Sequence, residues 1–172
     1  FLIASMFMSC TKDTNTPITQ NSELEIEHIK TLGGSKNESA QAVTKTTDGG
    51  YAILGYTQSN DGDVRNKSNE SYDYWLLKFD ARNQLQWQKT YGGSDDDRGF
   101  DLIHTSDGGF AILGKSKSND LDVSENSGFD DFWVSKLESN GSISWEYSYG
   151  FAGSDTPNSI IQTRDNGYLL TG

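Results

Sequence analysis

The feature that most constrains this chain is an internal repeat. The string TDGGYAILG at residues 47–55 returns as SDGGFAILG at 106–114 and as RDNGYLLTG at 164–172, so that Asp48, Asp107 and Asp165 lie 59 and 58 residues apart. A second string, YWLLKFDARNQLQWQKTYGG at 74–93, is repeated with substitutions as FWVSKLESNGSISWEYSYGF at 132–151. Two independent strings at one spacing indicate tandem copies of a single structural unit.

Each unit resolves into four predicted strands. The first strand, near residues 41–46, puts Val43 on the face that its equivalents Leu102 and Ile160 occupy. The second strand, at 51–57 and again at 110–116, is an unbroken apolar run. Such a run is typical of a strand that is covered on both faces.

The third and fourth strands of each unit are linked by a short turn, at residues 80–84 in the first copy. The third strand carries apolar residues such as Trp75. In the fourth strand, alternation predicts one wet face and one buried face. The buried face would hold Ile143, Trp145, Tyr147 and Tyr149.

An Asp-Gly turn joins the first and second strands of each unit, because glycine tolerates the positive φ of a tight hairpin. The tryptophans recur at the repeat spacing, which places them in the core of the unit. The predicted turn residues are Asp48, Gly49, Gly50, Asp107, Gly108, Gly109, Asp165 and Gly167, and the predicted core residues are Trp75, Trp87, Trp133 and Trp145.

The fold class predicted from these patterns is all-β, with tandem four-stranded antiparallel blades of a β-propeller. The 18 glycines and two prolines suit many short strands and turns. The sequence holds about two and a half units, whereas closure of a propeller takes at least four. We therefore expect an incomplete propeller whose further repeats lie outside this sequence; a β-solenoid or an open stack of sheets is the alternative.

The segments TDGGYAILGYTQSND, DYWLLKFDARNQLQW and TYGGSDDD, with their second copies, resemble the bacterial β-propeller repeat called SBBP. The resemblance covers about residues 29–172 and implies a secreted or surface protein. It implies no particular activity, because one fold hosts many functions.

The N-terminal segment differs in composition from the rest. Residues 1–9 are mostly apolar, Ser9 precedes Cys10, the only cysteine, and a polar stretch follows. This junction resembles the lipobox of a bacterial lipoprotein at the end of a signal peptide; the alternative is a secretory segment with an incidental cysteine. We predict a signal peptide at 1–10, a flexible tether at 11–28 and repeats at 29–172, with copies at 29–87, 88–145 and 146–172. Lipidation of Cys10 would anchor the protein to the outer membrane or cell surface.

The charge of the chain limits the classes of partner that it can bind. A formal net charge of −11 with scattered lysines and arginines excludes nucleic acid as a plausible ligand. No nucleophile elbow, phosphate loop or zinc-ligand spacing occurs, and His104 is expected on a solvated strand face. These observations favour a binding or scaffold module for an unknown glycan or protein. The alternative is a fragment of a propeller enzyme, either quinoprotein dehydrogenase-like or glycan-active.

A loop after the second strand carries paired aspartates in both copies. The loops read SNDGDV at 59–64 and SNDLDV at 118–123. Carboxylates at this spacing could converge on calcium, which takes oxygen ligands; otherwise the Asn and Asp side chains shape ordinary turns. The calcium hypothesis concerns Asp61, Asp63, Asp120 and Asp122, and the sequence predicts no other cofactor.

Overall fold

The computed structural model describes residues 2–5 and 28–172, which form two compact units at 1–32 and 33–172. In the first unit, β1 (Leu2–Ser5) pairs antiparallel with β2 (His28–Thr31). Cys10 and the predicted tether up to residue 27 lie outside the described residues. The described chain contains strands and no helix, so the all-β prediction is confirmed.

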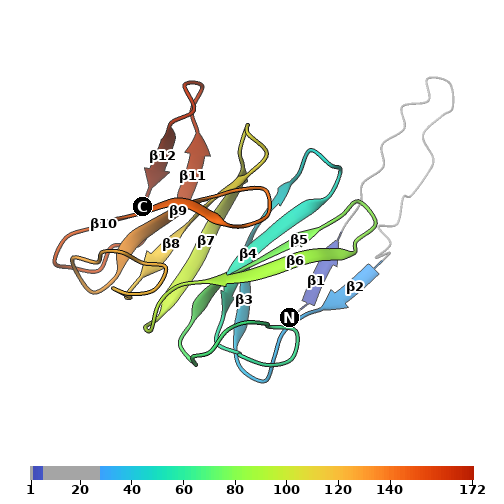
Figure 1. Ribbon diagram of the computed structural model, residues 1–172, viewed down its shortest axis with the longest axis horizontal. Coiled ribbons are helices and arrows are strands. Elements are labelled where there is room, and N and C mark those ends of the chain that lie inside the picture. The colour runs from blue at the N-terminus through green and yellow to red at the C-terminus, as the bar shows by residue number, and fades with distance from the viewer. Residues whose placement is uncertain (1, 6–27) are drawn as a thin grey trace, which may run out of the picture. The chain divides into compact units, whose positions relative to one another are not determined.

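The second unit consists of consecutive antiparallel sheets (Figure 1). The first sheet holds β3 (Glu38–Lys45), β4 (Tyr51–Thr57), β5 (Asp73–Phe79) and β6 (Leu85–Tyr91). The second sheet holds β7 (Asp97–His104), β8 (Phe110–Ser116), β9 (Asp131–Leu137) and β10 (Ile143–Tyr149). The third sheet holds β11 (Ser159–Gln162) and β12 (Tyr168–Thr171). Tandem four-stranded sheets of the propeller-blade type are thus present, and they do not close within the described chain.

The copy boundaries proposed from the sequence, at residues 87 and 145, fall inside β6 and β10. A tandem repeat fixes the length of the unit but leaves its starting point open. The sheets themselves begin at Glu38 and Asp97 and end at Tyr91 and Tyr149.

The core lies between successive sheets, at what we call the first junction (first and second sheets) and the second junction (second and third sheets). β4 and β8 are buried along nearly their whole length, as their unbroken apolar sequences predict. At the first junction, Leu54 and Leu76 pack in one cluster with Ile112 and Trp133. At the second junction, Ala111, Leu113 and Val134 cluster with Ile160.

Aromatic side chains connect the sheets across the first junction. The Tyr74 ring lies 4.7 Å from the Trp133 ring, and its hydroxyl donates a hydrogen bond to Trp133 O at 3.0 Å. A β-carbon at Gly114 would come within 2.5 Å of the Tyr74 hydroxyl oxygen, so only glycine leaves room for this phenol. The hydroxyl of Tyr91 likewise donates to Gly141 O at 2.8 Å.

The predicted buried face of β10 is wrong in two respects: Tyr147 and Tyr149 are exposed, and Ile143 does not share the side of Trp145. The register between β9 and β10 shifts between Ile143 and Trp145, so Ser144 is bulged. As a result Ile143 packs into the first junction, whereas Trp145 packs into the second. A β-bulge inserts one residue and so moves the following side chains to the other face.

Val43 also departs from expectation. It shares its strand face with the positions of Leu102 and Ile160, yet it is 68% exposed while Leu102 is 4% exposed and Ile160 is 1% exposed. Leu102 faces the first sheet and Ile160 faces the second. No four-stranded sheet precedes β3 in the described chain, so the face of Val43 lacks the equivalent neighbour.

This contrast makes a matched test of junction packing. Leu102→Ala should lower the free energy of unfolding by about 2–5 kcal/mol, because it removes apolar contacts and leaves a cavity. Val43→Ala, at the equivalent exposed position, should change it by no more than about 0.5 kcal/mol. Urea unfolding of both variants measures the difference. Equal losses would show that Leu102 does not pack as described.

Candidate functional site

An open cleft of about 500 Å³ lies at the second junction. Trp145 and Tyr168 form one continuous aromatic wall, with their rings in edge-to-face contact and their centroids 5.5 Å apart. Polar side chains from the turn after β7, from β9 and from the third sheet complete it. The lining residues are Ser106, Asp107, Lys136, Trp145, Gln162, Asn166 and Tyr168.

The polar floor of the cleft is a hydrogen-bonded ion pair. Lys136 Nζ lies 2.9 Å from Asp107 Oδ2 and donates to Leu137 O at 3.0 Å. Asp107 Oδ1 accepts bonds from Thr105 Oγ1 and Gly109 N. The bonds from Thr105 and Lys136 hold the pKa of Asp107 well below its ordinary range. The carboxylate therefore stays charged while its outer edge faces solvent.

The same ion pair is present in the first sheet. Lys78 Nζ lies 2.8 Å from Asp48 Oδ2 and donates to Gln86 Oε1 at 2.9 Å. Bonds from Lys78 and Thr46 lower the pKa of Asp48. Sequence reasoning assigned Asp48 to the turn but missed the lysine, whose recurrence at 78 and 136 in the repeat was the available signal.

The predicted turn residues close each hairpin through similar bonds. The second turn position has positive φ in each copy: 81° at Gly49, 85° at Gly108 and 64° at Asn166. Asp165 Oδ1 accepts from Thr163 Oγ1, and from Gly167 N at 3.4 Å. The backbone of the three turns is closed by bonds to Gly50 O, Gly109 O and Gly167 O.

The four tryptophans occupy two kinds of place. Trp75 and Trp133, at the start of the third strands, are buried. Trp87 and Trp145, from the fourth strands, are half-buried at the cleft end of each junction. Trp87 meets Phe110 edge to face at 5.8 Å, as Trp145 meets Tyr168. His104, expected in solvent, is half-buried with its ring 5.5 Å from Phe110.

The aspartates of the calcium hypothesis bind backbone amides. Asp61 Oδ1 accepts from Ser35 N at 2.8 Å, which lowers the pKa of Asp61. Asp63 Oδ2 accepts from Gly33 N at 3.0 Å. Within residues 2–5 and 28–172, no group of three or more His, Cys, Asp or Glu side chains is placed to hold a metal. The second copy repeats the pattern, with Asp120 on Ser94 N and Asp122 on Gly92 N.

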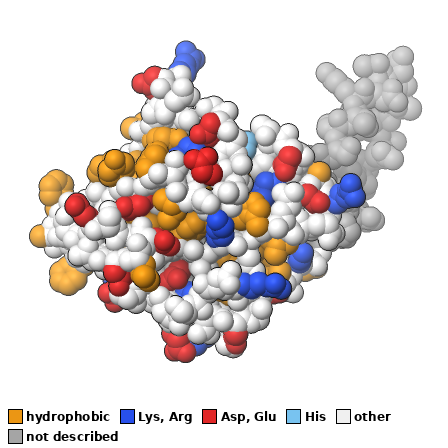
Figure 2. All heavy atoms as spheres, in the orientation of Figure 1, with side chains coloured by type: hydrophobic (Ala, Val, Ile, Leu, Met, Phe, Trp, Pro, Cys, Tyr) orange, Lys and Arg blue, Asp and Glu red, His pale blue; other side chains and the backbone are white. Residues whose placement is uncertain are grey.

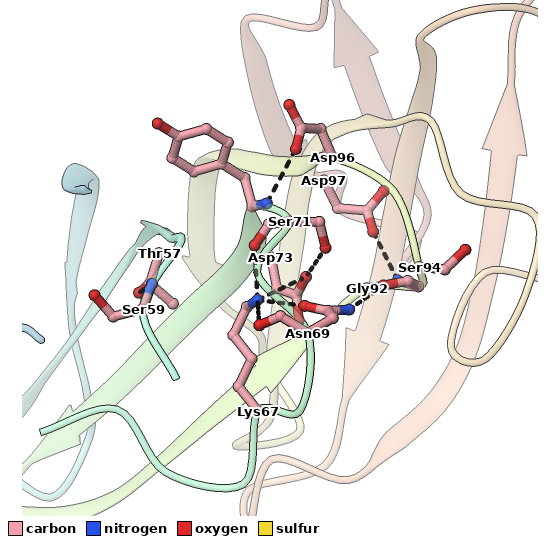
Figure 3. Close-up of polar contacts among 12 residues, drawn as sticks. Thr57, Ser59, Lys67, Asn69, Ser71, Asp73, Gly92, Ser94, Asp96 and Asp97 are labelled. Carbon is pink, nitrogen blue, oxygen red and sulfur yellow. Dashed lines mark hydrogen bonds and ion pairs between the residues drawn. The ribbon is translucent and has the colours of Figure 1, made fainter. Parts of the chain in front are cut away.

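A buried polar cluster lies at the opposite end of the first junction (Figure 3). Lys67 Nζ donates to Ser71 O at 2.6 Å and to both oxygens of Asn69, and it lies 3.7 Å from Asp73 Oδ1. Asn69 Nδ2 donates to Gly93 O at 2.7 Å. The loop before β5 is thereby fastened to the link between the sheets.

Two carboxyl groups of this cluster are buried near each other. Burial raises the pKa of Asp73 to about 7, opposed by the charge of Lys67 and assisted by that of Asp97. Burial also raises the pKa of Asp97, although the hydroxyls of Ser116 and Ser118 and the amide of Gly93 all donate to its carboxylate.

Large hydrophobic side chains are exposed on the second and third sheets and on the loops at the end opposite the cleft. Figure 2 shows them among acidic groups on the half of this face that carries β8 to β12. Tyr147 and Tyr149 continue a row of rings from Trp145, at spacings of 5.7 and 6.3 Å. The other large exposed apolar side chains of this region are Leu121, Phe129, Phe151, Ile161 and Leu169.

The chain matches no protein-family model and no curated protein sequence. The SBBP resemblance and the lipobox therefore stay predictions from sequence. Among the described residues, no helix has the length and apolar character that a bilayer crossing requires.

The Asp73 carboxyl predicts a pH dependence of stability. Its pKa rises from an ordinary 3.8 to about 7 on folding, so between about pH 4 and pH 7 the folded state keeps a proton that the unfolded state releases. The stabilisation of the folded state by this proton is fully present below pH 4 and is lost as the pH rises through 7. The difference in unfolding free energy between the wild type and Asp73→Asn should shift over this window. Parallel pH profiles for the two proteins would contradict the assignment.

Proposed function

We propose that this chain is a binding module, and that the cleft at the second junction takes a glycan ligand. The observation that carries the proposal is the combination of one aromatic wall, formed by Trp145 and Tyr168, with a polar floor. A concave site with apolar walls and a few fixed polar groups is the usual form of a small-ligand site.

The chemistry of the lining suits a saccharide. A sugar ring has an apolar C–H face that packs on an aromatic ring, and hydroxyls that need both donors and acceptors. Gln162 and Asn166 offer both, Asp107 accepts and Lys136 donates. The net charge of −11 disfavours a polyanionic ligand.

The row of exposed rings along β10 extends the proposed surface. Tyr147 and Tyr149 lie in line with Trp145, so a chain of sugar units leaving the cleft would meet further aromatic faces. Tyrosine supplies contact area together with a hydroxyl at the edge, and it loses little conformational entropy on binding.

The repeat provides a matched test of binding. Trp145→Ala should weaken binding of a saccharide, first identified on a glycan array, by about tenfold or more, because the aromatic wall is lost. Trp87→Ala removes the equivalent ring at the first junction and should leave the affinity unchanged. Isothermal titration calorimetry measures both. No saccharide bound, or equal affinity in the two variants, would refute the proposed site.

We also propose that the protein is held at the outer membrane or cell surface through lipid on Cys10. The support is the sequence around Ser9 and Cys10 alone. A binding module on a surface anchor would present its cleft to ligands outside the cell.

This anchoring has its own test, in cells that express the full gene. Cys10→Ala should abolish incorporation of labelled fatty acid and move the protein from the membrane fraction to the soluble fraction. Labelling and fractionation that do not change on substitution would remove the lipoprotein proposal and leave the binding proposal untouched.

A further inference from the structure

The two junctions repeat the same backbone linkage at the end opposite the cleft. In the first, Asp97 N donates to Tyr72 O at 2.5 Å; in the second, Asp155 N donates to Asp130 O at 2.6 Å. Asp97 and Asp155 also accept equivalent bonds, from Gly93 N and from Phe151 N. Asp131 stands where Asp73 stands in the first copy, one residue before the equivalent of Tyr74.

At the first junction a lysine compensates the buried carboxylate. The Lys67 ammonium is surrounded by Asn69, by the carbonyl of Ser71 and by Asp73 (Figure 3). Ser71 Oγ adds a donor to Asp73 Oδ1 at 3.3 Å. Lys67 and Ser71 thus both serve as partners of the buried Asp73 side chain.

At the second junction both of these partners are missing. The second loop is one residue shorter, and with that gap placed between residues 67 and 71, Asn126 stands where Lys67 stands and Phe129 where Ser71 stands. The Asn126 amide donates to Ser116 O. Lys115 pairs with the neighbouring Asp130 at 3.3 Å. Within the described chain no Lys, Arg or His side chain forms an ion pair with Asp131.

Asp131 is nevertheless buried. It is 1% exposed; its Oδ2 accepts a bond from Ser127 N at 2.6 Å, and its Oδ1 has no hydrogen-bond partner. A buried carboxylate is stable only when a cation or hydrogen-bond donors compensate its charge. A cation beside Oδ1 would supply that compensation.

Other oxygens gather around this atom. A β-carbon at Gly150 would contact both Asp131 Oδ1 and Asp155 Oδ2, the latter at 2.8 Å. A β-carbon at Gly128 would lie 3.0 Å from Asp131 Oδ1 and 2.5 Å from Gly153 O, and would also contact Phe151 O. Two carboxylates and two carbonyls thus lie around these glycines. Asp155 Oδ2 also accepts from Phe151 N, and Gly153 O accepts from Phe129 N.

We infer that a calcium-type divalent cation binds at the second junction through Asp131 and Asp155, in the role that the Lys67 ammonium fills at the first junction. Calcium accepts carboxylate and carbonyl oxygens in flexible geometry, and the two carboxylates match its charge. This site is separate from the loops of Asp61 and Asp120, in which no buried carboxylate oxygen lacks a hydrogen-bond partner.

The test is thermal unfolding in millimolar calcium chloride and in excess chelator. Calcium should raise the Tm of the wild type by about 5 °C or more, since a ligand that binds only the folded state stabilises it. Asp131→Asn should abolish this shift, because its amide can donate to the nearby oxygens and removes the charge. Asp73→Asn, the matched change at the first junction, should keep the shift.

A second variant keeps the test decisive if Asp131→Asn folds poorly. Asn126→Lys supplies an ammonium at the position equivalent to Lys67 and should make the Tm indifferent to calcium, while calorimetry shows loss of calcium binding. No calcium shift in the wild type would overturn the inference. An undiminished shift in both Asp131→Asn and Asn126→Lys would also overturn it.

Discussion

Everything in the second unit depends on covering both faces of each sheet. β4 and β8 are apolar on both faces. An isolated sheet of this sequence would therefore expose apolar surface to water. Packing sheet against sheet removes that surface, and the size of the hydrophobic effect makes it the dominant stabilising term. The hairpin turns, the ion pairs of Asp48 and Asp107, and the links between sheets all serve to hold this stacking in register.

The polar ends of the junctions have diverged more than the apolar middle. At the cleft end, the Asp–Lys pair is retained in both complete sheets while the facing side chains change from His104 and Phe110 to Gln162 and Tyr168. At the far end, the buried carboxylates remain while their lysine does not. The apolar cores and the Asp–Lys pairs, which stabilise both complete sheets, are thus common to the copies. The two junctions differ in the polar side chains at their ends.

The sequence was sufficient to predict the strands of the second unit, their antiparallel order and the hairpin turns, because apolar runs and Asp-Gly signals are local. It did not predict β1 or β2. It did not reveal the bulge at Ser144, since a bulge depends on how β9 and β10 pair rather than on composition. It misjudged Val43 because burial depends on a neighbouring sheet. The roles of Lys67 and Lys136 were missed for a related reason: a lysine is ordinarily assigned to the solvent-exposed surface, and only the fold shows its carboxylate partner.

The phenol of Tyr74 has a consequence for the order of the copies. It bonds to Trp133 O above Gly114, whereas the second copy carries Phe132 at this position, against Gly172. Phe132 has no hydroxyl to offer the carbonyl of the following sheet. The copies are therefore not interchangeable modules. In a shuffled or permuted array, a phenylalanine ring would stand where a tyrosine hydroxyl now donates a hydrogen bond to the next sheet. A sequence that looks periodic encodes a fixed succession, in which each sheet is matched to its own neighbour.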